Sequence, residues 1–229
     1  MADFLELYKI LYGRYGYAGW WPVFSKRGTA GFSAEGYRES PASFPLADDE
    51  VDQIIIGAVL TQNTSWSNVE KAFSILEEND CLSRKHIIST EEKTLREWIR
   101  SSGCYNQKAK KLKNIFEYIG SVNEPTRSGL LSVWGIGPET ADSILLYGYA
   151  QPLFIADAYA KRVFSRIGLI NADAAYESLS LHLNENIPKD AALYRNYHAL
   201  IIAFGKEFCR KKPVCIHCPL GQYCSFPSK

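Results

Sequence analysis

The chain has 229 residues, of which 46% are hydrophobic and 22% are charged, so it can bury a core and a wholly disordered chain is excluded. Its net charge of +1 excludes a bulk polycation, so any nucleic acid would have to be held by a local basic patch. No apolar run approaches the roughly 18 residues that a membrane helix needs, and the acidic, amphipathic start is unlike a signal peptide. We therefore expect a cytoplasmic protein.

Helical patterns follow one another along the chain. Apolar residues at helical spacing predict a first helix over residues 4–12, after which residues 13–45 are irregular and rich in Gly, Ser, Pro and aromatic residues. Further helices are predicted over residues 47–61, 65–79, 90–101, 106–119, 138–149, 158–168, 174–186 and 191–207. No segment predicts a strand of useful length, so the expected fold class is all-α.

Four of the six cysteines crowd near the C-terminus. Cys209, Cys215, Cys218 and Cys224 are separated by five, two and five residues. Four thiolates in one short loop suit either Zn²⁺ or an iron–sulfur cluster. A zinc ribbon more often has two close cysteine pairs joined by a longer arm, so the long outer loops favour a [4Fe–4S] cluster. Two disulfides are disfavoured because no export signal is visible.

A glycine turn and an aspartate form a second group of candidates. Gly135-Ile136-Gly137 links two predicted helices, and Pro138 stands at the first position of the second. Two glycines allow close approach of the backbone to an anion at the following helix start. Asp157 follows an apolar stretch and precedes the next amphipathic helix, where an ordinary N-cap is the alternative role.

In this order and spacing the motifs resemble the endonuclease III-like helix-hairpin-helix DNA glycosylases that carry an iron–sulfur loop. The segments 60–63 (Leu-Thr-Gln-Asn) and 103–109 (Gly-Cys-Tyr-Asn-Gln-Lys-Ala) add to the resemblance. It implies two helical domains. A six-helix barrel with the hairpin would span residues 43–150, and residues 1–42 and 151–229 would form an N/C-terminal domain with the [4Fe–4S] loop.

The resemblance also implies roles for single residues. Asp157 corresponds to the catalytic aspartate, which stabilises an oxocarbenium-like sugar after the damaged base is flipped out of double-stranded DNA. Gln62 is the candidate to fill the gap in the duplex. Gly135 and Gly137 would hold the DNA backbone. Glu139 occupies the position of the lysine that forms a Schiff base in members that cut the strand, which predicts base removal without lyase activity.

Cations between the first two cysteines are candidates for binding phosphate. Arg210, Lys211 and Lys212 lie there, and Lys108 is a further candidate. A solvated charge run is the alternative. A protein that examines one lesion at a time suits a monomer associated with the nucleoid.

The substrate is predicted from an aromatic pair. Trp20-Trp21-Pro22, with the hairpin sequence, looks most like the 3-methyladenine branch of the family. An alkylated purine is cationic, and an indole face binds it by stacking and cation–π attraction, so Trp21 and Trp20 are the expected base wall. Glu139 also fits this branch. The alternatives are a glycosylase for uracil, mismatched thymine or oxidised bases, a non-catalytic binder of DNA structure, and a redox protein.

Overall fold

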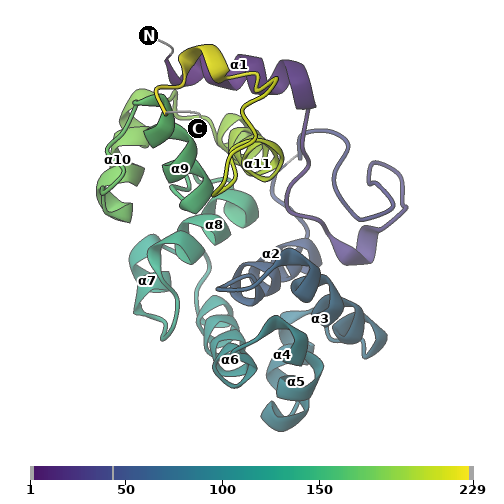
Figure 1. Ribbon diagram of the computed structural model, residues 1–229. Helices are drawn as coiled ribbons and strands as arrows, with labels where there is room; N and C mark the ends of the chain where they lie inside the picture. Colours follow the sequence, from purple (N-terminus) through teal and green to yellow (C-terminus); the bar gives the residue numbers. More distant parts are fainter. Residues whose placement is uncertain (1–2, 43, 227–229) are drawn as a thin grey trace. The chain divides into compact units, whose positions relative to one another are not determined.

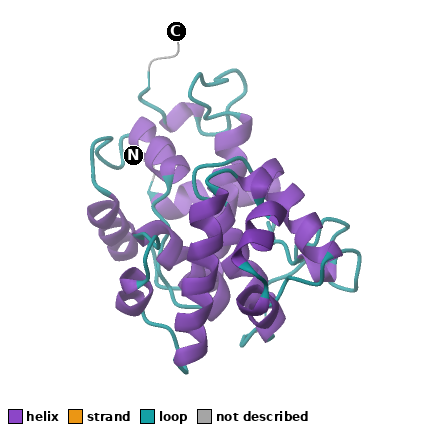
Figure 2. Ribbon diagram, turned by 90° about the horizontal axis from the view of Figure 1, so that it is seen from below, coloured by secondary structure: helices purple, strands orange, loops and turns teal. Residues whose placement is uncertain are grey.

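The structure, a computed structural model, describes residues 3–42 and 44–226 (Figures 1 and 2). Within these residues the regular elements are helices, and an isolated bridge pairs Phe32 with Arg38. The all-α prediction is therefore confirmed. The α-helices are α1 (Phe4–Tyr15), α2 (Asp48–Leu60), α3 (Trp66–Glu78), α4 (Arg84–Ser89), α5 (Glu92–Trp98), α6 (Tyr105–Ser121), α7 (Arg127–Ser132), α8 (Pro138–Tyr149), α9 (Ala158–Ile167), α10 (Tyr176–Asn186) and α11 (Ala191–Glu207). In the described part of the chain, every helix is too short or too polar to cross a membrane.

The chain divides into two compact units. Within the described residues, the first comprises residues 3–20, 39–41 and 152–226, and the second comprises residues 21–38, 42 and 44–151. The second unit thus contains α2 to α8 and the hairpin. It also contains residues 21–38, which the sequence-based division assigned to the other domain.

Helix α2 is the central element of the second unit. It packs against α8 and α6, and Ile54, Ile55 and Ile56 are all at most 3% exposed. Three consecutive buried isoleucines mean that neighbours cover α2 on several sides. The longer α6 buries one apolar stripe and, of its four lysines, also buries Lys108. The α7–α8 turn is thereby attached to a firmly packed helix pair.

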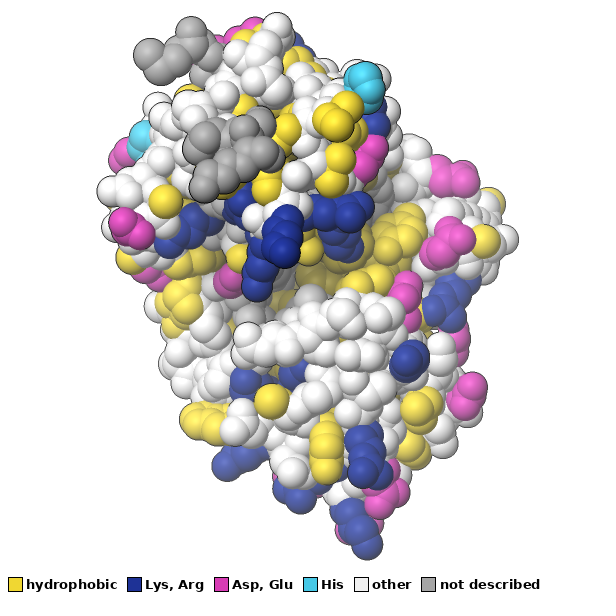
Figure 3. All heavy atoms as spheres, viewed as in Figure 1, with side chains coloured by type: hydrophobic (Ala, Val, Ile, Leu, Met, Phe, Trp, Pro, Cys, Tyr) yellow, Lys and Arg dark blue, Asp and Glu magenta, His cyan; other side chains and the backbone are white. Residues whose placement is uncertain are grey.

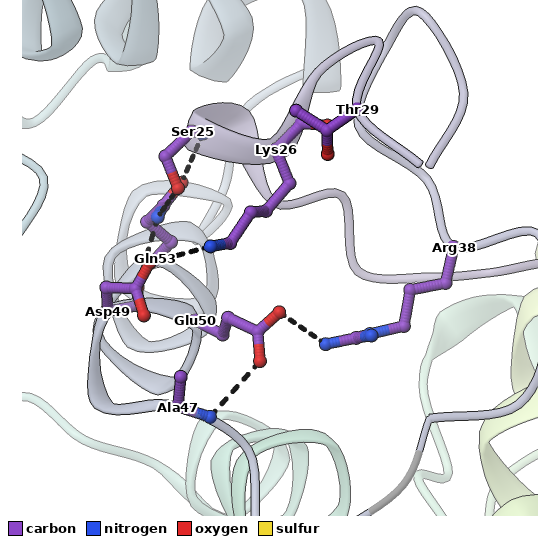
Figure 4. A network of polar contacts seen from close by, with 8 residues as sticks. All are labelled: Ser25, Lys26, Thr29, Arg38, Ala47, Asp49, Glu50 and Gln53. Atoms are coloured by element: carbon purple, nitrogen blue, oxygen red, sulfur yellow. Dashed lines mark hydrogen bonds and ion pairs between the residues drawn. The ribbon is translucent and has the colours of Figure 1, made fainter. Parts of the chain in front are cut away.

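The irregular segment before α2 is fixed to that helix by polar contacts (Figure 4). The Gln53 side chain accepts a hydrogen bond from the Ser25 backbone N–H at 3.0 Å and donates one to the Ser25 hydroxyl at 2.7 Å. Arg38 forms a 2.6 Å ion pair with Glu50, which is itself buried. The Phe24 ring stacks on Phe73 of α3 at 4.0 Å. These contacts give residues 21–38 one defined course without regular secondary structure.

The first unit joins the two ends of the chain. Helices α1 and α9 both pack against α11. The Phe4 ring of α1 meets the edge of Phe164 of α9 at 5.0 Å, and the Tyr197 hydroxyl of α11 donates a 2.7 Å hydrogen bond to the Phe4 carbonyl. Burial raises the pKa of Tyr197 well above its usual value, so this hydroxyl remains a donor.

Candidate active site and DNA interface

Asp157 is a buried carboxylate at the start of α9. It is 8% exposed and is the N-cap of the helix, because its Oδ1 accepts a 2.7 Å hydrogen bond from the Ala160 N–H. Its Oδ2 lies 3.5 Å from Nε2 of His198 on α11. One oxygen therefore fixes the carboxylate to the backbone, and the other faces a polar side chain of a second helix. The N-cap role and a catalytic role are compatible.

His198 is a site residue that sequence reasoning missed. It is 4% exposed, among the apolar residues of α11. The helical pattern of α11 could have indicated that this position is buried. It contained no signal that His198 would face Asp157, because the two residues belong to different helices far apart in the sequence.

The four C-terminal cysteines line one small cavity of the first unit. Its volume is about 30 Å³, and Arg166, Phe208 and Leu220 line it as well. Burial raises the pKa of Cys218, and the neighbouring cysteine thiols raise it further. Arg166 holds the loop, since its guanidinium donates to the Cys209 sulfur at 3.3 Å and to the carbonyls of Arg210 and Lys211. The four cysteines that are close in the sequence thus also lie close together in the structure.

The four cysteine sulfurs are suitable ligands for a soft metal ion or cluster, but their side chains are not arranged as a complete metal site. In residues 3–42 and 44–226, no group of three or more His, Cys, Asp or Glu side chains is arranged to hold a metal ion. Four sulfurs around one cavity are nevertheless the ligand type that iron–sulfur clusters and Zn²⁺ require. The prediction of a [4Fe–4S] cluster remains a prediction.

Lys211 and Lys212 are exposed on this cysteine loop. Lysine and arginine side chains gather over the α9 and α11 part of the first unit in the space-filling view (Figure 3). Lys108 differs from them, and its predicted place in the basic patch is wrong. It is 2% exposed, and its ammonium donates hydrogen bonds to the carbonyls of Leu60 and Ser102 at 2.8 and 2.6 Å. Burial lowers its pKa to about 8.

The exposed pair gives a first testable prediction. The double variant Lys211→Ala, Lys212→Ala should weaken binding to every DNA sequence and lower the slope of log affinity against log salt by about 2, because each phosphate contact contributes roughly 0.9. Titrations at several salt concentrations measure this slope. The control is Lys9→Ala, Lys189→Ala, which removes two exposed lysines elsewhere in the same unit. Equal slopes for the two double variants would mean that Lys211 and Lys212 are solvated surface charges that do not contact phosphate.

The glycine turn has the geometry expected of a helical hairpin. Gly135 has a φ of +84°, which favours glycine, and a Cβ there would lie 2.4 Å from Cε of Lys111. Gly137 is the N-cap of α8 and Pro138 begins the helix. Glu139 is exposed in the first turn, where it suits the positive end of the helix dipole.

Gln62, the predicted gap filler, is bound to the hairpin in this structure. Its amide nitrogen donates to the Thr140 hydroxyl at 2.9 Å and to the Gly135 carbonyl at 3.3 Å, and its oxygen accepts from the Lys111 ammonium at 2.6 Å. The side chain thus lies beside the hairpin within the second unit. It would have to leave these partners to enter a duplex.

The two adjacent tryptophans belong to different compact units. Trp21 is 8% exposed in the second unit, and its ring lies 5.5 Å from Trp66 and 6.0 Å from Tyr147. Gly57 makes room for it, since a Cβ there would lie 3.2 Å from the indole. Trp20 is half-buried, with the Lys206 ammonium 5.7 Å from its ring centroid. Trp21 is therefore part of an aromatic cluster of the second unit.

The glycine turn between α7 and α8 in one unit and the buried aspartate that caps α9 in the other are features of a helix-hairpin-helix protein. The chain belongs to the HhH-GPD superfamily of base excision DNA repair proteins, which it matches over residues 56–189. It is a DNA glycosylase of the endonuclease III-like kind, and DNA with a damaged base is its partner.

Relatives and solved structures agree with this membership. A protein of Methanocaldococcus jannaschii that bears a provisional name as a DNA repair glycosylase is 40% identical over 96% of this chain and 94% of its own length. Endonuclease III of Sulfolobus acidocaldarius is 30% identical over 75% of this chain and 80% of its own. The H. pylori 3-methyladenine DNA glycosylase bound to 1,N6-ethenoadenine has a TM-score of 0.68 and 27% identity, covering 90% of this chain and 98% of that chain.

Proposed function

We propose that this protein is a monofunctional glycosylase that hydrolyses the N-glycosidic bond of alkylated purines, such as 3-methyladenine and 7-methylguanine, and leaves an abasic site. The observation that carries the proposal is the buried carboxylate of Asp157, fixed through Oδ1 and with Oδ2 facing His198. A fixed negative charge stabilises the cationic sugar that forms as the bond breaks, and it can orient the attacking water. Flipping the base out of the duplex costs a few kcal/mol, which the protein must offset through backbone contacts.

Glutamate at position 139 of the hairpin supports hydrolysis without strand cleavage. A carboxylate cannot form an imine, and Glu139 takes the lysine's place. The Lys111 ammonium, which comes from α6, is hydrogen-bonded to Gln62.

Borohydride provides a sharp check of this point. We expect no covalent complex between wild-type protein and damaged DNA after borohydride treatment, and strand breaks only after alkali. The variant Glu139→Lys tests whether a lysine at this position is sufficient to form a covalent complex that borohydride traps. Efficient trapping of the wild type would contradict the proposal, and Lys111→Ala would then identify or exclude the responsible amine.

The substrate class rests on the aromatic cluster around Trp21 and on similarity to the H. pylori 3-methyladenine glycosylase. Cationic purines are good leaving groups and need little acid assistance, whereas an electron-rich indole attracts their charge. In this proposal Trp21, with Trp20 as a further candidate, lies against the flipped base.

A panel of duplexes tests the substrate. We expect release of methylated purines and little release of uracil, mismatched thymine, oxidised pyrimidine or 8-oxoguanine. Trp21→Ala should lower methylpurine release by about tenfold or more, Trp21→Phe should retain part of it, and Trp98→Ala on α5 is the control, with folding checked by circular dichroism. Release of uracil or thymine without methylpurines would favour the mismatch alternative. No release from any duplex would favour a non-catalytic binder.

We further propose that Cys209, Cys215, Cys218 and Cys224 hold a [4Fe–4S] cluster. When bound, the cluster would fix the loop that presents Lys211 and Lys212. Arg166 supports this arrangement through its contacts with the Cys209 sulfur and the loop carbonyls.

A further inference from the structure

Trp134, at the tip of the α7–α8 hairpin, is the most exposed tryptophan of the chain. It is 52% exposed, whereas the other four are buried or half-buried. Its neighbours Val133 and Ile136 are 9% and 5% exposed, and the Ile136 N–H donates a 3.1 Å hydrogen bond to the Val133 carbonyl. The turn thus buries Val133 and Ile136 and leaves the indole of Trp134 exposed.

Two lysines of α6 lie at the same place. The Lys110 ammonium is 5.1 Å from the Trp134 ring centroid, which is a cation–π contact. The stem of Lys111 passes Gly135 so closely that a Cβ there would lie 2.4 Å from Lys111 Cε. An exposed indole, the exposed Lys110 and a glycine backbone thus lie together at the hairpin, while the Lys111 ammonium is bound to Gln62.

This combination matches the chemistry of an opened nucleic acid strand. Exposed aromatic rings stack on unpaired bases, and neighbouring cations hold the phosphates of the same strand. A fully stacked duplex offers no free base face to an indole. A glycosylase also opens the duplex wherever it flips a base.

We propose that Trp134, with Lys110 beside it, stacks on an unstacked nucleobase of the strand that the hairpin holds. The proposal rests on the assignment of the chain as a DNA glycosylase and is independent of which damaged base it releases. It gives the hairpin a preference for locally opened DNA, which would bring the enzyme to sites where pairing is already disturbed.

Binding to lesion-free DNA tests the proposal separately from catalysis. The probes are a fully paired duplex and the same duplex with one unpaired nucleotide, measured by fluorescence anisotropy at several salt concentrations. Wild type should bind the second duplex more tightly. Trp134→Ala should lose roughly tenfold in affinity for it, with an unchanged salt slope, and Trp134→Phe should lose less. Lys110→Ala should lower the slope by about 0.9.

Lys71→Ala is the matched control, because Lys71 is an exposed lysine on α3 of the same unit. It should change neither the preference nor the slope. The proposal would be overturned if Trp134→Ala bound each duplex as tightly as wild type does. It would also be overturned if Trp134→Ala lost the same factor in affinity for the paired duplex as for the duplex with the unpaired nucleotide. Failure of the glycosylase assignment would appear differently, as no base release from any damaged duplex by a protein whose binding preference is intact.

Discussion

Asp157→Asn is expected to lower base release by about 10²- to 10³-fold while leaving DNA affinity unchanged. The substitution keeps the size of the side chain and an oxygen that can accept the Ala160 N–H, so the cap of α9 survives. It removes the negative charge that faces the forming sugar cation. Single-turnover release of the base and equilibrium DNA binding, measured on the same preparation, separate the two effects.

Asp190→Asn is a matched control for the capping role. Asp190 is the N-cap of α11 in the same unit and accepts from the N–H groups of Ala192 and Leu193. This variant should retain full activity. If Asp157→Asn were equally active, Asp157 would be a cap alone and the catalytic proposal would fail.

The second large effect is expected at the cysteine loop. Protein purified without air should be brown and contain about four irons per chain. Cys218→Ala should lose most of this iron and destabilise the first unit by several kcal/mol, because metal binding contributes to folding free energy. Iron content, visible absorbance and thermal unfolding measure the change without reference to activity.

Cys104→Ser is the control for this experiment. Cys104 is exposed in the second unit and does not line the cysteine cavity, so its replacement should leave the iron content unchanged. A colourless wild-type protein with one zinc per chain would contradict the cluster proposal and would favour the alternative metal for the same four ligands.

The sequence predicted those features that depend on local spacing. The all-α class, the stripe of α6, the glycine turn and the start of α9 each follow from residues close together in the chain. Helix α4 was not predicted, because its six residues are fewer than the roughly 11 residues over which a helical apolar pattern can be recognised.

Features that depend on distant pairing could not be predicted. The course of residues 21–38 is set by contacts such as Arg38 with Glu50, and an irregular segment has no periodicity to reveal them. The contact of His198 on α11 with Asp157 at the start of α9, and that of Lys111 on α6 with Gln62 in the turn after α2, likewise join segments far apart in the sequence. Lys108 looked like one more surface lysine of α6, and only the carbonyls beside it explain its burial.

The packing of α1 against α11 has a consequence for biosynthesis. Helix α1, whose residues Phe4, Leu7 and Leu11 are buried, is synthesised well before α11, the helix on which it packs. The second unit is complete in sequence by Gln151, so it can fold while α1 still waits for its partner. Until α11 is made, the apolar face of α1 lacks the helix on which it packs, so we expect a chain shortened before α11 to be digested by proteases faster than the full chain.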